Sequence, residues 1–275
     1  MLILSASKEE IHQAGTSLTA SGAAIASGPA STRLARVANE EAAAIRDAHP
    51  QQYGFFAAVP SLLDTEAALS EVQYALDVLK ADGNYYLGHG KFKAIWDELD
   101  KRAAVVFLHP THPVDTTPVN KLLAQPVVDY PHGTTRAAVD LIVSDTVRTH
   151  QSVKIILSYA GGTLPWLAQR PAGLVGFSKK IDKSLEEFLA EAKSFYFDLA
   201  LSGSPEVVSS MLKFAQNDHI LFGSDFPYAD EGSILYFNGK LAGALGEMRD
   251  RERDGMGSIL GLRISSSLGL YRVDS

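Results

Sequence analysis

The chain has 275 residues, which suits one large domain, and 46% of them are hydrophobic and 21% charged, as in an ordinary globular protein. The formal net charge of −7 leaves no basic surplus for binding phosphates, so we expect no nucleic-acid partner. The chain has no cysteine, which excludes disulfides, thiolate zinc sites and cysteine nucleophiles, and no apolar run approaches the roughly 18 residues that span a bilayer.

The N-terminal region predicts a strand, a loop and a helix. Residues 1–5 form a strand-like apolar run, residues 15–32 are rich in small and polar residues, and residues 33–48 have helical spacing. Because the first residue already lies in a strand, we expect that an upstream segment is missing. No secretory signal precedes these elements, so the chain is expected to be cytosolic and to have no membrane partner.

Alternating elements continue through the middle of the chain. Residues 53–60 predict a strand and residues 64–80 an amphipathic helix. A polar, glycine-rich loop follows, and residues 92–99 predict a helix in which Trp96 packs inward. The strand at residues 103–108 then leads into a long proline-rich loop, a kind of connection that is usually functional or disordered.

The C-terminal half repeats this alternation. The proline-rich loop, residues 111–133, is followed by a predicted helix at residues 134–147 and a strand at residues 154–158, and then by residues 164–170 and a mixed stretch. The further elements expected are a helix at residues 184–193, a strand at 194–200, a helix at 204–216, a strand at 219–222 and helix or loop from 239.

Three predicted strands end in the same way, on a polar or aromatic side chain followed by Gly or Pro. The strands are followed by His109, Tyr159 and Asp225, and a fourth strand holds Asp198 near its end. In a barrel of parallel strands these ends meet at the catalytic rim. Asp225 alone could equally cap the next helix, but three similar strand ends favour a site.

The alternation of strand and helix predicts the α/β class with a parallel sheet. The strand-end residues favour a (β/α)8 barrel over an open doubly wound sheet. No G-x-G-x-x-G motif follows a strand, so a dinucleotide-binding fold has little support. We expect one domain over residues 1–275.

Four segments of this sequence resemble the amidohydrolase-related decarboxylases, the family of aminocarboxymuconate semialdehyde decarboxylase and γ-resorcylate decarboxylase. They are LHP (108–110), ILSYAGGTLPWLAQR (156–170), FYFDLALSG (195–203) and ILFGSDFPYA (220–229). The phrases YGFFAAVPSLLDTEAAL and FLHPTHP are most similar to the fungal 6-methylsalicylate decarboxylase branch. The resemblance covers roughly residues 35 to 235 in the right order.

The resemblance implies a distorted TIM barrel of the amidohydrolase superfamily with a divalent metal, zinc or manganese, at its rim. His109 and Asp225 match two of the family's metal ligands. The implied function is that of a decarboxylase-like lyase acting on a small aromatic carboxylic acid, such as 6-methylsalicylate, in fungal secondary metabolism.

The sequence departs from the family pattern in three places. No H-x-H or E-x-H pair lies near the N-terminus, as if the chain began at the family's second strand. Tyr159 stands where the family has its catalytic histidine. The loop at residues 81–90 is short, so the fourth strand is expected to be missing. Open strand edges would then need another strand, an N-terminal substitute or a homodimer interface.

Four further residues are candidates for binding the substrate. His112 could close over it from the proline-rich loop, although a solvated surface role is the plainer interpretation. Asp198 could orient a ligand or cap a turn. Arg136 and Arg170 could pair with a substrate carboxylate, although each is more often a surface or interface arginine.

Three functional hypotheses follow. In the first, His109, Tyr159 and Asp225 form the centre of a decarboxylase whose missing metal ligands come from Asp198, His112 or a partner subunit. In the second, the chain is a metal-independent hydrolase or lactonase on the same scaffold. In the third, it is a non-catalytic relative, either a pseudoenzyme or a truncated product.

Overall fold

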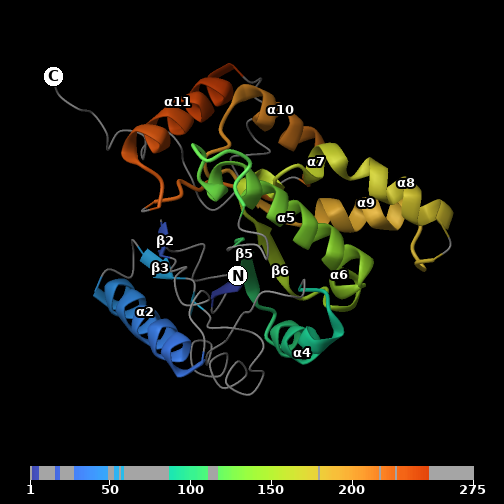
Figure 1. Cartoon of the computed structure of the whole chain (residues 1–275), viewed down its shortest axis with the longest axis horizontal. Coiled ribbons are helices and arrows are strands. Elements are labelled where there is room, and N and C mark those ends of the chain that lie inside the picture. The colour runs from blue at the N-terminus through green and yellow to red at the C-terminus, as the bar shows by residue number, and fades with distance from the viewer. Residues whose placement is uncertain are drawn as a thin grey trace.

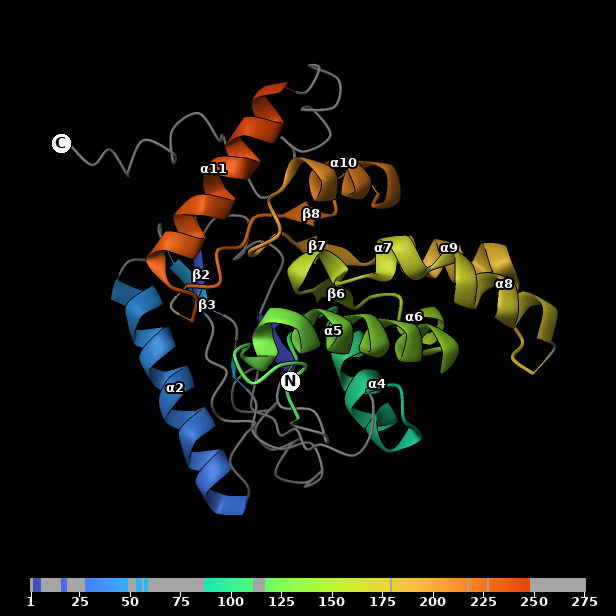
Figure 2. The same cartoon turned by 45° about the horizontal axis from the view of Figure 1, so that its top comes forward.

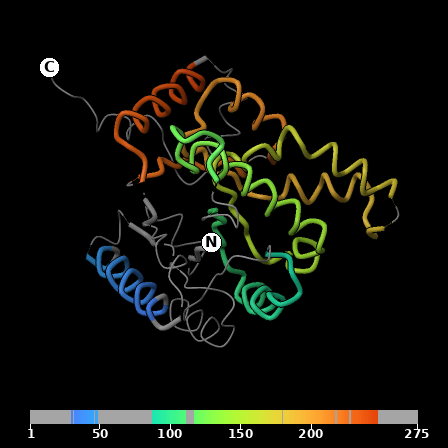
Figure 3. The backbone as a smooth tube through the Cα atoms, in the orientation of Figure 1, coloured from blue at the N-terminus to red at the C-terminus, as the bar shows by residue number. Residues whose placement is uncertain are grey.

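The computed structural model describes residues 2–5, 16–18, 28–48, 53–55, 57–58, 87–110, 117–178, 180–216, 218–226 and 228–247 (Figures 1 and 3). The described strands form two sheets. The larger has the strand order β4-β1-β5-β6-β7-β8, and the smaller pairs β2 with β3. Their bounds are β1 Leu2–Ser5, β2 Thr16–Leu18, β3 Tyr53–Phe55, β4 Ala57–Ala58, β5 Val105–Leu108, β6 Lys154–Leu157, β7 Tyr196–Asp198 and β8 Ile220–Leu221.

The described helices follow the strands in the predicted alternation. Their bounds are α2 Gly28–Ala48, η2 Gly90–Phe92, α4 Lys93–Lys101, α5 Gln125–Val143, α6 Thr146–Thr149, η3 Tyr159–Gly161, α7 Leu164–Leu167, α8 Gln169–Ser178, α9 Leu185–Ser194, α10 Pro205–Phe214 and α11 Glu231–Glu247. Within the described ranges, none of these helices combines the length and the apolar character that crossing a membrane requires.

Strands β5 to β8 form a parallel, sequentially ordered sheet, as predicted. Each pairs with the next in the chain, with Phe107 opposite Ile156 in the first pair and Phe197 opposite Ile220 in the last. Figure 2 shows β6, β7 and β8 side by side, with helices alongside them. Helices join each of these strands to the next, so their C-terminal ends lie at one edge of the sheet.

The all-parallel prediction is wrong at β1. This strand runs antiparallel to β5, with Ile3 opposite Phe107, and also pairs antiparallel with β4. The N–H and C=O groups on the far side of β5 would otherwise form an open edge, and β1 pairs with them. β1 is therefore the N-terminal substitute that the sequence predicts for that edge.

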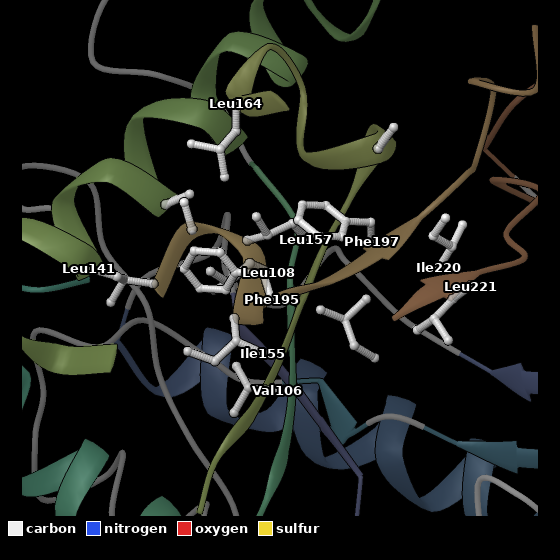
Figure 4. Close-up of a cluster of buried hydrophobic side chains, with 14 of the residues drawn as sticks. Val106, Leu108, Leu141, Ile155, Leu157, Leu164, Phe195, Phe197, Ile220 and Leu221 are labelled. Carbon is white, nitrogen blue, oxygen red and sulfur yellow. The ribbon is translucent and has the colours of Figure 1, made fainter. Parts of the chain in front are cut away.

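The core lies between the parallel strands and the helices that pack on them (Figure 4). Val106 and Leu108 on β5 are almost fully buried, whereas Phe107 between them is only partly buried, as expected for side chains that alternate along a strand. The ring of Trp96 is also buried, as predicted, and its Nε1–H donates to the Leu87 carbonyl oxygen at 2.8 Å.

Helix α5 begins inside the predicted proline-rich loop, nine residues before the expected Thr134. Pro126 lies in the first turn, where a helix needs no N–H group, so this proline is compatible with helix initiation. Pro131 lies inside the helix and removes one backbone hydrogen bond from it. The remainder of that predicted loop, residues 111–116 with His112, lies outside the described residues.

Other predicted boundaries also need correction. α2 starts at Gly28 rather than at residue 33, and β2 forms within the predicted loop at residues 15–32. The single strand predicted at residues 53–60 is two strands, β3 and β4, which belong to different sheets.

The helix predicted at residues 134–147 ends at Val143, because Asp145 has a left-handed φ of +61° that a helix cannot continue through. α11 starts at Glu231, before the expected residue 239. The helix predicted at residues 64–80 lies outside the described residues.

Candidate active site

Four consecutive parallel strands place the predicted side chains at one edge of the sheet. His109 follows β5, Tyr159 follows β6 after one residue, Asp198 ends β7, and Asp225 lies four residues beyond β8. Because parallel strands end on the same side, these four residues of distant sequence come together. The structure therefore joins the three predicted strand-end residues and adds Asp198 beside them.

Both ring nitrogens of His109 have a partner. Nδ1 lies 2.8 Å from the Pro110 carbonyl oxygen, and Nε2 lies 2.7 Å from the Tyr159 hydroxyl. A carbonyl oxygen only accepts, so Nδ1 carries the proton and the Nε2 lone pair accepts from the Tyr159 O–H. Burial lowers the pKa of His109 to about 4, which keeps the ring neutral near pH 7.

A tight turn after β6 directs Tyr159 toward His109. Tyr159 and Ala160 both have a φ of +55°, and the next two residues, Gly161 and Gly162, also have positive φ. A non-glycine residue in this region is strained, and such strain is typical of functional sites. Burial raises the pKa of Tyr159 well above its usual range, so its hydroxyl stays protonated.

The two glycines of this turn are required by close packing. A Cβ atom added at Gly161 would lie 2.9 Å from the Phe197 ring, and one added at Gly162 would overlap the Pro131 carbonyl oxygen. The turn is also tied to α5, because the Thr135 hydroxyl accepts the Thr163 N–H at 2.8 Å. The position of Tyr159 is therefore fixed by α5 and β7 as well as by β6.

The Asp225 carboxylate interacts with the Tyr159 hydroxyl, and its charge adds to the rise in the pKa of Tyr159. Burial raises the pKa of Asp225 to about 6, and the hydrogen bond from Tyr159 opposes that rise. Its φ is +64°, so Asp225, like Tyr159, has a strained backbone. Asp225 does not cap α11, because Asp230 accepts the Ser233 N–H in that position.

Asp198 lies beside Asp225 and packs against a glycine. A Cβ atom added at Gly223 would overlap both carboxylate oxygens of Asp198, so only glycine allows this close approach. The Ala200 N–H donates to Asp198 Oδ1 at 2.5 Å. Burial, opposed by that bond and assisted by the charge of Asp225, raises the pKa of Asp198 to about 7.

The Tyr159 hydroxyl has one proton and two acceptors. His109 Nε2 is hydrogen-bonded to this hydroxyl at 2.7 Å, and the Asp225 carboxylate also interacts with it. One O–H proton can satisfy one acceptor fully, so the second contact is completed only when a further proton binds to the cluster. His109, Tyr159 and Asp225 therefore form a unit that can take up or release a proton.

Tyr130 is part of the site, although the sequence placed it in a loop. Its ring meets the His109 ring edge-on, with the centroids 5.8 Å apart and the planes at 90°. Tyr130 lies on α5 one turn before Thr134, whose hydroxyl is 2.9 Å from that of Ser158. The only sequence signal was that a long polar connection is usually functional.

The other candidate residues have different outcomes. Arg136 on α5 and Arg170 on α8 are exposed, and their role in binding a carboxylate stays a prediction. His112 and His12 lie outside the described residues. His150 and His219 each have a hydrogen-bond partner away from the four strand-end residues. His150 Nε2 lies 3.1 Å from Asp97 Oδ1, and His219 Nδ1 lies 3.1 Å from the Phe195 carbonyl oxygen.

The donor types at the site suit a divalent cation. Imidazole and carboxylate are ligands of zinc and manganese, and a metal-binding histidine commonly donates its second ring N–H to a carbonyl, as His109 does to Pro110. Within the described part of the chain, no group of three or more His, Cys, Asp or Glu side chains could hold a metal ion. A catalytic metal usually has three protein ligands, and the assignment of His109 and Asp225 as two of them stays a prediction.

Comparisons with known proteins agree with this arrangement. Residues 14–256 match the family described as Amidohydrolase. The 6-methylsalicylic acid decarboxylase of Penicillium expansum is 51% identical over 74% of this chain and 66% of its own length, just under two thirds. That of Aspergillus aculeatus is 50% identical over 80% of this chain and 72% of its own length.

Solved structures with the same fold include two decarboxylases. The 5-carboxyvanillate decarboxylase of Sphingomonas paucimobilis has a TM-score of 0.70 at 19% identity, over 89% of this chain and 77% of that one. The dihydroxybenzoic acid decarboxylase of a Polaromonas species, solved with bound manganese, has a TM-score of 0.66 at 17% identity over 95% and 81%. The predicted barrel-like α/β fold is confirmed, and the chain belongs to the amidohydrolase family.

Proposed function

We propose that the chain is a decarboxylase-type lyase that removes the carboxylate of a small aromatic acid of the 6-methylsalicylate type. The observation that carries the proposal is the hydrogen-bonded cluster of His109, Tyr159 and Asp225 at the C-terminal ends of parallel strands. Relatives at about half identity are named as 6-methylsalicylic acid decarboxylases, which supports this substrate class.

The reaction needs one proton at a ring carbon. Protonation of the carbon that bears the carboxylate disrupts the aromatic ring, and the bond to the carboxylate then breaks. Its electron pair restores the ring, and carbon dioxide leaves. An aromatic carbon is a weak base, so a positioned general acid lowers this barrier.

The Tyr159 hydroxyl is the group that we propose delivers the proton. A tyrosine of raised pKa is a weak acid alone, so its proton must be replaced as it leaves. Asp198 has a pKa of about 7, so its carboxyl can hold a proton near neutral pH, and its charge acts on the Tyr159 hydroxyl. We propose that Asp198 returns the proton to Tyr159, while Asp225 stays ionised.

We further propose that His109 and Asp225 bind a divalent ion, zinc or manganese, with a third ligand from outside the described residues or from a partner subunit. When bound, such an ion would orient the carboxylate and phenol oxygens of the substrate. A relative in fold was solved with manganese, which supports the choice of metal. Arg136 and Arg170 as carboxylate ligands, a homodimer and a cytosolic location belong to the same proposal.

A metal-independent hydrolase on the same scaffold is the second candidate. It is favoured by the Tyr159 hydroxyl, which stands on the Nε2 lone pair of His109 where a metal would bind. It is also favoured by the lack of a three-ligand cluster among the residues that the structure describes. Activity that survives a chelator would distinguish this candidate from the decarboxylase.

The test is carbon dioxide release from 6-methylsalicylate by the purified chain, with and without added Mn²⁺ or Zn²⁺. We expect release that depends on the metal and falls at least about a hundredfold in His109→Ala, a loss typical of catalytic groups. His132→Ala, which removes an exposed histidine on α5, is the matched control. Turnover that is equal in the two variants would refute the proposed site.

A further inference from the structure

The hydroxyl oxygen of Tyr159 lies on the coordinating side of His109. The Nδ1 atom of His109 is bonded to the Pro110 carbonyl, so Nε2 has the only free lone pair of the ring. That lone pair points at the Tyr159 oxygen, 2.7 Å away. A zinc–nitrogen bond is about 2.0–2.1 Å long, so an ion on this lone pair and the hydroxyl could not both keep these positions.

The same hydroxyl also interacts with the second proposed ligand, Asp225. The Tyr159 oxygen is therefore a neighbour of both His109 and Asp225. An imidazole nitrogen and a carboxylate are ligands that suit a divalent cation. Tyr159 places a neutral hydroxyl beside both of them.

The hydroxyl is held there firmly. The Tyr159 side chain is 8% exposed, and its backbone lies in a turn where Gly161 and Gly162 pack against β7 and α5. The buried ring has little freedom to swing away without disturbing these contacts. A cation must displace this hydroxyl in order to bind, and the free energy that the displacement requires weakens its binding.

From this geometry we propose that the Tyr159 hydroxyl competes with a divalent cation for His109 and Asp225, and so lowers the affinity of this chain for the metal. The inference deepens the proposed function and rests on its assignment of these two ligands. It makes Tyr159 a determinant of metal occupancy, because a cation must break the hydrogen bond between His109 and Tyr159 before it binds.

The test compares Mn²⁺ and Zn²⁺ binding by calorimetry to the metal-stripped full chain and to Tyr159→Phe. Because the phenylalanine ring keeps the packing but lacks the hydroxyl, we expect at least about tenfold tighter binding, the equivalent of one hydrogen bond of about 1.4 kcal/mol. Tyr236→Phe is the matched control, since Tyr236 is an exposed tyrosine on α11 and is not among the residues of the site. It should leave the affinity unchanged.

Equal or weaker binding by Tyr159→Phe would overturn the inference, and so would the lack of binding by both proteins. Adding His109→Ala to Tyr159→Phe should abolish the gain. A gain that persists in this double variant would mean that the metal binds elsewhere, which also overturns the inference. If Tyr159→Phe does not fold, Tyr159→Leu provides the same comparison.

None of these readouts involves carbon dioxide release. Failure of the inference is thus distinct from failure of the proposed decarboxylase activity. If the chain is a metal-dependent decarboxylase whose metal affinity does not depend on the Tyr159 hydroxyl, the proposed function stands and only the proposed competition is refuted.

Discussion

Tyr159 and Asp225 interact although β7 lies between their strands in the sheet, and the charge of Asp225 adds to the burial that raises the pKa of the Tyr159 hydroxyl. Both residues have left-handed backbones, with φ of +55° and +64°. Each such residue costs on the order of 1–3 kcal/mol. Strain at both residues of one interacting pair indicates that the fold keeps these two side chains near each other.

Gly223→Ala is expected to reduce activity at least about tenfold, because its Cβ atom would displace the Asp198 carboxylate next to Asp225. Carbon dioxide release and the melting temperature are the measurements. In an Asp198→Ala background the obstructing group is absent, so Gly223→Ala should cost much less stability there. Additive losses in the two backgrounds would show that Asp198 and Gly223 do not interact.

Gly162→Ala is expected to destabilise the protein by about 2 kcal/mol or more, because φ is +63° and the Cβ atom would overlap the Pro131 carbonyl oxygen. Gly173→Ala in α8 meets no atom within 4 Å and should stabilise by about 0.5–1 kcal/mol. The measurement is the free energy of unfolding of each variant in denaturant. Similar changes in unfolding free energy for the two variants would mean that the turn after β6 is not tightly packed.

Asp198→Asn should gain stability over the wild type as pH rises. The pKa of Asp198 is about 7 in the folded protein and near 3.8 when unfolded, so the folded state binds the extra proton between these values. The wild type therefore loses stability from about pH 4 to pH 7, by an amount on the order of 2 kcal/mol after allowance for partial solvent access, whereas the Asn variant does not.

The measurement is the melting temperature of both proteins from pH 4 to pH 8 in the presence of a chelator. The difference between them should grow up to about pH 7 and then level off. A difference that does not change with pH would contradict the raised pKa of Asp198.

Lys183→Met is expected to destabilise the protein by about 3–5 kcal/mol. The Lys183 side chain is fully buried, and its Nζ lies 3.0 Å from Asp145 Oδ1 and also contacts Glu191. Burial already raises the pKa of Glu191, so removing the lysine leaves a buried acid without its ion-pair partner. The control Lys193→Met, at an exposed position on α9, should change the unfolding free energy by less than about 0.5 kcal/mol.

The strand ends of the site could be predicted because the signal is local. A short apolar run that stops at His109, Tyr159 or Asp225 and is followed by Gly or Pro marks the end of a buried strand. Parallel pairing then brings these ends together with no further information. The close packing of the Asp198 carboxylate against Gly223 was not predicted.

The rest could not be predicted because it depends on distant contacts. Nothing in residues 2–5 determines whether that strand runs parallel or antiparallel to β5, since the choice depends on which edge is open. Tyr130 joined the site because α5 starts at Gln125, in a stretch whose prolines indicate a loop. The hydroxyl of Tyr159 meets His109 because β5 pairs with β6, and it interacts with Asp225 although β7 separates β6 from β8.

The most direct test of the central claim is the reaction of 6-methylsalicylate in D₂O, followed by proton NMR of the product. The account predicts that the metal-supplemented chain replaces the carboxylate with one deuterium at the same ring carbon, and that His109→Ala does so at least about a hundredfold more slowly. The account would be contradicted if the wild type yields no such product, or if His109→Ala yields it at the wild-type rate.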